Sequence, residues 1–313
     1  MSIREHNTAP QNAEYAEHYS NTNAVDGKSR TIHCLDKGFV RLVDYMGSDA
    51  AIVQAARVSY GAGTKQVHED RGLIRYLMRH AHTTPFEMVE FKFHVKLPIF
   101  VARQWIRHRT ANVNEYSGRY SVMPDEFYLP DIEQIRPQSH TNKQGRADEA
   151  LPKEKAEYIR TLLHNAQERS YKEYGKLLEE NLTRELARIN LPVSQYTEWY
   201  WKIDLHNLFH FLRLRLDSHA QYEIRVYAQA IAQIVRDIVP YAYEAFEDYV
   251  LYAVRLTRPE LHIMRRLLSG LQKTTDMLVD VDSITPETGL SKREVEEFRD
   301  KLARMTGSKE DML

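Results

Sequence analysis

The chain has 313 residues, of which 42% are hydrophobic and 28% charged, and its formal net charge is −1. This length and composition predict a soluble globular protein with one large domain or two small ones. The balanced charge argues against a protein that coats nucleic acid, because such proteins carry a basic excess. The single cysteine, Cys34, excludes an internal disulfide and a thiolate zinc site, and it favours a reducing compartment.

Both ends of the chain differ from its middle. Residues 1–30 are polar with several acids, which predicts a weakly attached extension rather than a signal peptide. The composition turns polar again in 258–313, where Ser291 and Glu294 form a capping box for a final helix. No run of about 18 apolar residues occurs, so we expect no transmembrane helix and a cytoplasmic protein. The main domain is therefore 31–257.

The first part of this domain alternates strand and helix patterns. Strand patterns occur at 31–47 and 90–97, and helix patterns at 50–60 and 69–81. Gly61-Ala62-Gly63 has the start of a dinucleotide-binding loop. However, Gln66 stands where the third glycine is needed and no βαβ unit follows, so we reject that interpretation.

The loop HTTPFE precedes the strand pattern at 90–97. Thr84 as N-cap, Pro85 at the first position and Glu87 at the third predict a capping box that opens a short helix. His82 has two interpretations. It is an ordinary loop histidine, or it holds a ligand against a helix N-terminus whose free N–H groups attract anions.

The most unusual stretch is 107–120, RHRTANVNEYSGRY, which continues a helix pattern that begins at Pro98. Arg103 and Arg107 lie four residues apart on that helix, and Gln104 and His108 form the neighbouring row. Arginines in a last turn often only balance the helix dipole. That explanation covers one or two cations and leaves the long polar run unexplained.

Five lysines and arginines in 96–119 face a single acid, Glu115, so this segment predicts a local anion-binding site in a neutral protein. Arginines can hold phosphate through two hydrogen bonds at once. Asn112, Asn114 and Glu115 offer amide and carboxylate groups that can read a heterocycle or a sugar hydroxyl. The residues alone thus indicate an enzyme that binds phosphorylated nucleotides.

Loop patterns dominate 123–145, and 151–180 predicts a long helix with charges on its outer face. Thr183 then caps a short helix that contains Arg188. The aromatic run 196–203 predicts core or strand packing more than stacking on a ligand ring.

Asp204 is the expected N-cap of a helix at 205–215. His206 and His210 are i,i+4 neighbours on it, and Arg213 continues the stripe. Two histidines at this spacing could bind a metal. We predict no metal site, because there is no H-E-x-x-H glutamate, no cysteine partner and no nearby third ligand.

Ser218 and Gln221 resemble a second capping box, which predicts that a new helix starts there. Arg215 would then lie at a helix–helix junction, where a side chain can extend out of the packing. The segment 240–256 predicts a further aromatic helix.

Arg107-His108-Arg109, seven residues and then Ser117 resemble the R-H-R-x7-S signature of the flavin-dependent thymidylate synthases. The surrounding N-E-x-S-x-R-Y also matches, as do HTTPFE, FHVKLPIFVARQW, ARINLP and LRLDSHAQYEIR in the same order. The similarity covers about 31–256. It implies an α+β fold with a twisted, antiparallel-rich sheet wrapped by helices, and a homotetramer whose sites are shared between subunits.

The resemblance also implies a reaction, the methylation of dUMP to dTMP, with methylenetetrahydrofolate giving the carbon and NADPH reducing FAD. Arg215 is its expected catalytic residue, because a guanidinium beside uracil stabilises the negative charge formed when N3 loses its proton. The positions matched to dUMP are Gln104, Arg107, Glu115, Ser117, Gly118, Arg119, Arg188 and Arg215. The positions matched to FAD are His82, Thr84, Arg107, His108, Arg109, Glu115, Asp204, His206 and His210.

Two other functions compete with this one. A cysteine-dependent nucleotide methyltransferase would use Cys34 beside His33, but an activated thiolate needs an accessible, electropositive setting and Cys34 lies in an apolar run. A nucleic-acid-binding module would use the arginines of 107–120 and would bind with a steep salt dependence. The near-neutral net charge argues against it, and we expect neither nucleic acid nor a membrane as a partner.

Overall fold

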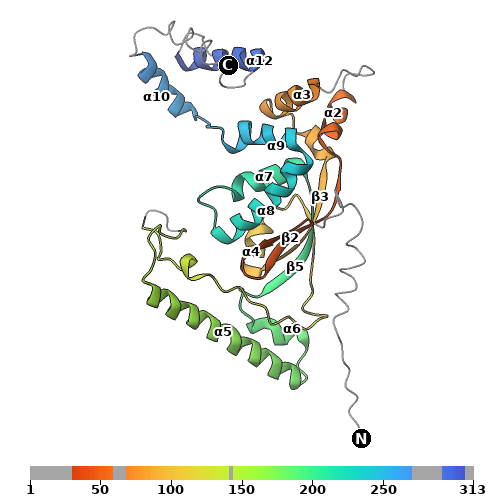
Figure 1. The fold of residues 1–313 in the computed structure, drawn as a ribbon, viewed down its shortest axis with the longest axis vertical. Coiled ribbons are helices and arrows are strands. Elements are labelled where there is room, and N and C mark those ends of the chain that lie inside the picture. Colours follow the sequence, from red (N-terminus) through yellow and green to blue (C-terminus); the bar gives the residue numbers. More distant parts are fainter. Residues whose placement is uncertain (1–29, 59–67, 141–143, 270–290, 307–313) are drawn as a thin grey trace. The chain divides into compact units, whose positions relative to one another are not determined.

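The computed structural model describes residues 30–58, 68–140, 144–269 and 291–306 (Figure 1). The chain divides into two compact units, Met1–Tyr252 and Ala253–Leu313. The Gly61–Gly63 motif and nearly all of the predicted N-terminal extension lie outside the described residues. The predicted boundaries of the main domain and of the two extensions stay predictions.

A five-stranded antiparallel sheet forms the centre of the first unit, in the order β1-β2-β3-β5-β4. Its strands are β1 (Thr31–Cys34), β2 (Gly38–Met46), β3 (Glu90–Pro98), β5 (Tyr196–Asp204) and β4 (Asn112–Glu115). The α+β fold with an antiparallel sheet is confirmed. β4 was not predicted, because all four of its residues are exposed and polar ones outnumber apolar ones. Its pairing with β5 alone makes it a strand.

The core lies on one face of this sheet. Alternation along β3 buries Phe91, Phe93, Val95 and Leu97 on that face, where each is 0% exposed. Three helices contact the sheet there: α4 (Ile99–Trp105), α7 (Leu205–Arg215) and α8 (Tyr222–Ile238). Trp105 joins the layers, since its ring stacks on Phe211 of α7 at 4.8 Å and meets Trp201 of β5 edge-on at 5.0 Å.

The opposite face of the sheet carries the alternate, polar residues of the same strands. His94 Nε2 contacts Glu198 Oε2 at 2.8 Å, and Arg41 reaches His94 Nδ1 at 2.8 Å. Lys202 forms an ion pair with Glu90 at 2.8 Å. The period-two alternation predicted for β3 therefore separates an apolar face from a charged one.

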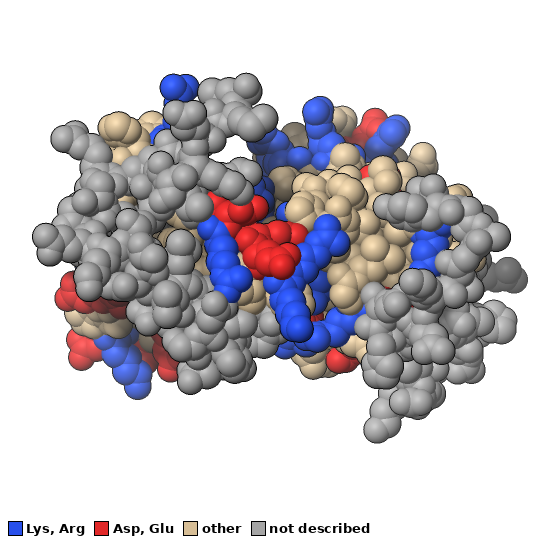
Figure 2. Space-filling view, turned by 90° about the horizontal axis from the view of Figure 1, so that it is seen from above, with Lys and Arg blue, Asp and Glu red and all other residues tan. Residues whose placement is uncertain are grey.

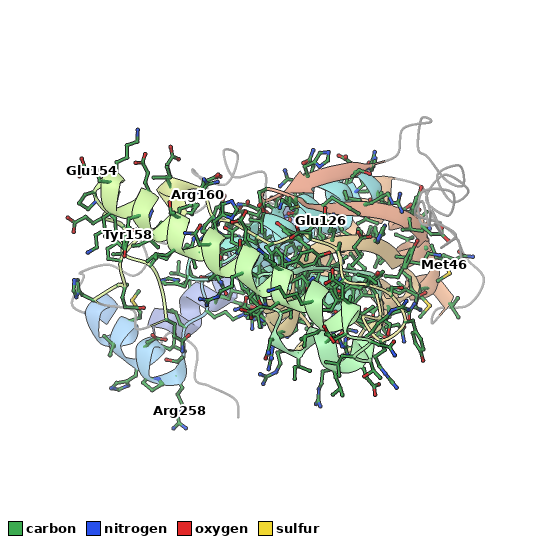
Figure 3. All side chains as sticks on the ribbon, turned by 90° about the horizontal axis from the view of Figure 1, so that it is seen from below. Met46, Glu126, Glu154, Tyr158, Arg160 and Arg258 are labelled. Carbon is green, nitrogen blue, oxygen red and sulfur yellow. The ribbon has the colours of Figure 1, made fainter. Side chains whose placement is uncertain are left out.

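Both units contain further helices. They are α2 (Asp49–Val58), α3 (His68–Arg79), the 3-10 helices η2 (Thr84–Met88), η3 (Ile132–Gln134) and η4 (Arg188–Asn190), α5 (Lys153–Glu179), α6 (Arg184–Ala187), α9 (Pro240–Phe246), the π-helix η5 (Glu247–Leu251), and, in the second unit, α10 (Arg258–Ser269) and α12 (Lys292–Thr306). The long helix α5 agrees with the pattern at 151–180. Figure 3 labels Glu154, Tyr158 and Arg160 along it, and Arg160 Nε donates to the carbonyl of Pro130 at 3.2 Å.

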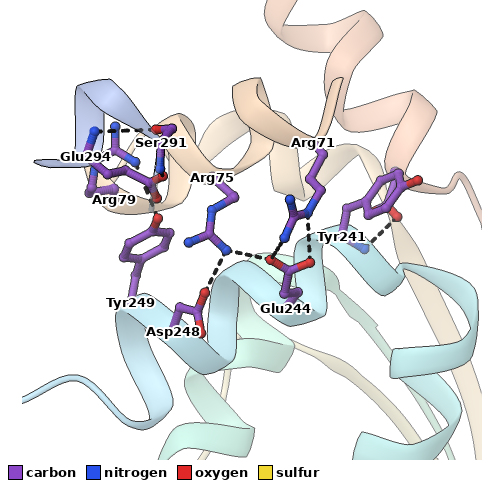
Figure 4. A network of polar contacts seen from close by, with 10 residues as sticks. Arg71, Arg75, Arg79, Tyr241, Glu244, Asp248, Tyr249, Ser291 and Glu294 are labelled. Atoms are coloured by element: carbon purple, nitrogen blue, oxygen red, sulfur yellow. Dashed lines mark hydrogen bonds and ion pairs between the residues drawn. The ribbon is translucent and has the colours of Figure 1, made fainter. Parts of the chain in front are cut away.

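An ion network fastens α3 to α9 and η5 (Figure 4). Arg71 donates to both carboxylate oxygens of Glu244, at 2.9 and 2.6 Å. Arg75 bridges Glu244 and Asp248 at 2.6 Å each, and its side chain is only 11% exposed. Partial burial makes such a network stronger than ordinary surface pairs. It holds two segments that lie about 170 residues apart in sequence.

The predicted helix starts divide into two groups. Asp204 caps α7, since its Oδ1 accepts the Asn207 N–H at 2.9 Å, and Ser291 and Glu294 form the reciprocal box of α12. The box at Thr84 is wrong, because this residue lies inside a 3-10 helix whose N-cap, Thr83, makes no side-chain bond. Thr183 is the N-cap of α6, but it too makes no side-chain bond.

The box at Ser218 and Gln221 is also wrong. Asp217 Oδ1 accepts the His219 N–H at 2.8 Å, and this local turn competes with the helix. α8 therefore begins only at Tyr222. The helix expected to run from Pro98 into 107–109 ends at Trp105, and the predicted aromatic helix at 240–256 changes into a π-helix after Phe246.

Candidate functional site

Two helix ends meet beside the edge strand β4. Arg107, His108 and Arg109 follow the end of α4, and Arg215 is the last residue of α7. Arg215 Nε donates a hydrogen bond to His108 Nε2 over 3.1 Å. The His108 ring also meets Phe211 edge-on at 5.0 Å. The structure therefore brings the cationic segment after α4 into contact with the last residue of α7.

The surroundings of His108 keep it uncharged. Burial, then the positive charge of Arg215 and the neighbouring His210, lower the pKa of His108 to about 4. Since Nε2 accepts the bond from Arg215, the ring hydrogen belongs on Nδ1. Within the described residues Arg215 has no carboxylate partner. No carboxylate of the described residues therefore neutralises its guanidinium charge.

The α7 stripe predicted from sequence is present. Burial comes first among the causes that lower the pKa of His210, followed by the charges of Arg213, His206 and Arg215. These four side chains thus form one positively biased row. Across the residues that the structure describes, there is no group of three histidines, cysteines or acids that could hold a metal.

The arginines after and within α4 are open to ligands. Arg103, Arg107 and Arg109 are exposed, and none forms an ion pair with a described residue. Arg119 differs, because its Nε lies 3.1 Å from Glu185 Oε2. On the face of the molecule in Figure 2, described basic side chains adjoin acidic ones. Arg103, Arg107 and Arg109 thus concentrate positive charge in one short segment, which suits a small anion.

The segment after β4 is shaped by close contacts. Thr197 Oγ1 donates to Glu115 Oε1 at 2.8 Å, which fixes the carboxylate at the sheet edge. Gly118 is buried, and a Cβ there would lie 2.6 Å from Met123 Sδ and 3.0 Å from Arg188 Cδ. Only glycine lets Arg188 of η4 approach this backbone so closely.

Two buried polar atoms in this part of the structure have no hydrogen-bond partner among the described residues. They are Gln104 Oε1 and Trp199 Nε1. Trp199 is the β5 residue opposite Glu115 in the strand register. A buried polar atom without a partner costs about 1–3 kcal/mol, so a bound ligand that satisfies it gains affinity.

Three of the residues matched to FAD belong to the first half of α7: its N-cap Asp204, His206 and His210. Leu205 N–H donates to the carbonyl of Val89 at 2.8 Å, which joins the start of α7 to the end of η2. Thr84 is the first residue of η2 and His82 precedes this helix, and both are exposed. Both Asp204 oxygens are engaged by Asn207, at 2.9 and 2.7 Å, so the carboxylate is occupied by its own helix.

Sequence reasoning missed several residues of this region. Thr197 supports Glu115, and its position on the alternating strand 196–203 could have suggested an inward side chain. Arg184 donates to the Tyr120 carbonyl at 2.6 Å, and Glu185 pairs with Arg119. No sequence signal connects these residues, because they meet only through the tertiary fold.

Fold and site together define an α+β protein that carries cationic side chains at two helix ends, an arrangement suited to an anionic ligand. A family model described as thymidylate synthase complementing protein (Thy1) matches residues 41–241. The flavin-dependent thymidylate synthase of Ruegeria pomeroyi is 58% identical over 275 residues, covering 86% of this chain and 87% of the relative. That of Rickettsia bellii is 55% identical over 280 residues, covering 85% and 92%.

Among solved structures, the UMP/dUMP methylase PolB from Streptomyces cacaoi bound with 5-Br dUMP is similar, with a TM-score of 0.63 and 34% identity. The match covers 70% of this chain and 98% of PolB. The chain belongs to the family of flavin-dependent thymidylate synthases, which confirms the resemblance seen in its sequence. No helix in the described part of the chain is both long and apolar enough to cross a membrane.

Proposed function

We propose that this chain methylates dUMP to dTMP as a flavin-dependent thymidylate synthase in the cytoplasm. Methylenetetrahydrofolate would give the carbon, and NADPH would supply the hydride through FAD. The observation that carries the proposal is the pair of Arg215 and His108, a guanidinium without a carboxylate partner held by a neutral imidazole. His108 belongs to the polar segment 107–120, and both residues lie within the range 41–241 that the family model matches.

The nucleotide would lie between β4, the end of α4 and η4. PolB, which is similar to this chain, was solved with a dUMP analogue. The cations Arg107, Arg119 and Arg188 would bind its phosphate, because guanidinium groups match phosphate geometry. The unpaired Gln104 Oε1 would accept a hydrogen bond from the base or the sugar. Glu115, Ser117, Gly118 and Arg215 complete the proposed dUMP contacts.

The flavin would lie along α7. The exposed, unpaired Arg107 and Arg109 fit its phosphates. The histidines of α7 and His108, whose ring lies 5.8 Å from that of His210, offer ring edges and N–H donors. The proposed FAD contacts are His82, Thr84, Arg107, His108, Arg109, Glu115, Asp204, His206 and His210. When bound, the flavin supplies hydride chemistry that no side chain can provide.

Arg215 would activate the base. Its charge is not balanced by a carboxylate in the described residues, and burial lowers its pKa, although a guanidinium stays protonated near neutral pH. Placed beside uracil, it would stabilise the negative charge that forms when N3 loses its proton. C5 then becomes more nucleophilic. His108 would hold the guanidinium in place through the 3.1 Å bond.

We also propose a homotetramer whose sites are shared between subunits. Large apolar side chains are exposed next to the proposed phosphate contacts, with Leu186 at 49% and Ile189 at 70%. Exposed apolar groups grouped near functional residues are typical of protein interfaces. Light scattering coupled to size exclusion would give the mass, and a purely monomeric enzyme with full activity would contradict this part.

The experiment that tests the function combines colour with turnover. Purified protein should show flavin absorption and should form dTMP from dUMP when methylenetetrahydrofolate and NADPH are present. Colourless protein that cannot take up FAD would refute the proposal. Binding of duplex or single-stranded DNA with a steep salt dependence, without dTMP formation, would instead favour the nucleic-acid-binding alternative.

A further inference from the structure

The segment α6–η4 contacts the loop after β4 at three successive points. Arg184 Nη1 donates to the Tyr120 carbonyl at 2.6 Å. Glu185 Oε2 accepts from Arg119 Nε at 3.1 Å. Arg188 lies against Gly118. Two of these contacts hold the backbone of the loop, whereas the contact of Glu185 holds a cationic side chain.

Glu185 forms an ion pair with only one arginine of the proposed site. Of the arginines proposed to contact dUMP or FAD, namely Arg107, Arg109, Arg119, Arg188 and Arg215, only Arg119 has a carboxylate partner among the described residues. The guanidinium of Arg119 is therefore already paired with a carboxylate before any phosphate binds. A phosphate that binds Arg119 through Nε must displace this carboxylate, because both anions need the same N–H group.

We propose that Glu185 lowers the affinity of the nucleotide site for ligands that carry a phosphate, by occupying Arg119 until the phosphate replaces it. This inference rests on the proposed binding of dUMP. It adds a competitor to the site, a residue of the chain that opposes binding of any ligand that needs Arg119. A nucleoside without phosphate leaves the ion pair intact and does not meet this competition.

The exposure of the pair makes the exchange feasible. The side chains of Arg119 and Glu185 are 59% and 51% exposed. Exposed pairs contribute about 0.2–1 kcal/mol, which corresponds to about 1.4- to 5-fold in an equilibrium constant. A dianionic phosphate can outcompete a single carboxylate of this strength, since guanidinium–phosphate contacts are charge-assisted and frequently bidentate. Arg184 is not part of the exchange, because it holds a backbone carbonyl.

The test measures ligand affinity in the FAD-loaded, full-length protein by calorimetry. Glu185→Gln should tighten dUMP binding by about 1.4- to 5-fold and leave binding of deoxyuridine unchanged. The matched control is Glu179→Gln, which removes the same charge from an exposed position near the end of α5. It should leave both affinities at the wild-type value.

A double-variant cycle makes the assignment specific. Arg119→Ala should weaken dUMP binding, and adding Glu185→Gln to it should bring no further change, because the competition needs Arg119. Two results would overturn the inference: unchanged dUMP affinity in Glu185→Gln, or an equal change for deoxyuridine. A wild-type protein that binds neither dUMP nor deoxyuridine would instead refute the proposed function, so the two failures are distinguishable.

Discussion

Arg215 Nε and His108 Nε2 lie 3.1 Å apart, although 107 positions separate these residues in the sequence. The bond joins the end of α7 to the turn after α4, so neither helix alone forms the site. His108 can accept it only while the imidazole is neutral. Burial and the nearby charge of Arg215 lower the pKa of His108, and the neutral ring that results can hold the guanidinium of Arg215.

Replacement of Arg215 separates binding from chemistry. Arg215→Ala should keep the fold and the flavin absorption but lose most dTMP formation, because the positive charge beside the base is gone. Losses of a directed charge in a site commonly reach about 100- to 1000-fold in kcat. Single-turnover assays with dUMP would measure this. Arg169→Ala, at an exposed position on α5, is the control, and full activity in Arg215→Ala would remove Arg215 from the mechanism.

Acid should destabilise the protein partly through His108. Its pKa is about 4 in the folded protein and has an ordinary value of 6.5, so between these the unfolded chain binds more protons. Stability is then lost as the pH falls from 6.5 to 4, with a slope of at most about 1.4 kcal/mol per pH unit from this one group. Urea unfolding across this range would measure it.

His108→Gln keeps an acceptor for Arg215 but removes the titrating group. The difference in unfolding free energy between wild type and this variant should therefore change between pH 6.5 and 4 and stay constant above that range. His164→Gln on α5 serves as the control, because it makes the same substitution at an exposed histidine. Parallel pH profiles for wild type and His108→Gln would contradict the prediction.

Local patterns in the sequence predicted much of the fold. The alternation of β3, the cap Asp204 and the long helix α5 each depend on residues close in sequence, and each is present. β4 was missed because only its partner β5 makes it a strand. The capping box predicted at Ser218 is wrong, because the His219 N–H donates to Asp217 Oδ1 and forms a local turn there.

The candidate site shows the same limit. The segment 107–120 and Arg215 could be singled out by composition and by the family signature. Their direct contact, the pairing of Arg119 with Glu185 and the support of Glu115 by Thr197 could not, since each joins residues at least 66 positions apart. Such pairs depend on tertiary packing, which leaves no local pattern.

Cys34 provides a test of the cysteine-dependent alternative. The thiol is 1% exposed, and burial raises its pKa to about 12, so a thiolate nucleophile is not available at neutral pH. Cys34→Ser keeps a donor toward the Ile32 carbonyl, the bond partner of the thiol. Turnover per folded protein should remain within about two-fold of wild type. Loss of turnover with FAD still bound would refute a mechanism that uses only the flavin.

A buried carboxylate fastens the excursion between β4 and α5 to the start of α8. Glu223 is 1% exposed, and its Oε1 accepts hydrogen bonds from Arg146 and, at 3.1 Å, from the Tyr128 hydroxyl. Its other oxygen is buried without a partner among the described residues. Arg146 also donates to Gln134 Oε1 at 3.1 Å. Removal of the arginine would thus leave a buried, uncompensated negative charge.

Arg146→Ala should therefore reduce the unfolding free energy by about 3 kcal/mol, the lower end for a broken buried ion pair because Arg146 is partly exposed. Adding Glu223→Gln removes the orphaned charge and should restore part of that loss, so the two changes are not additive. Urea denaturation measures both, with Lys153→Ala at a 79% exposed side chain as the control. If Arg146→Ala costs no more than the control, Glu223 does not depend on Arg146, and the excursion is held by its other contacts to α5.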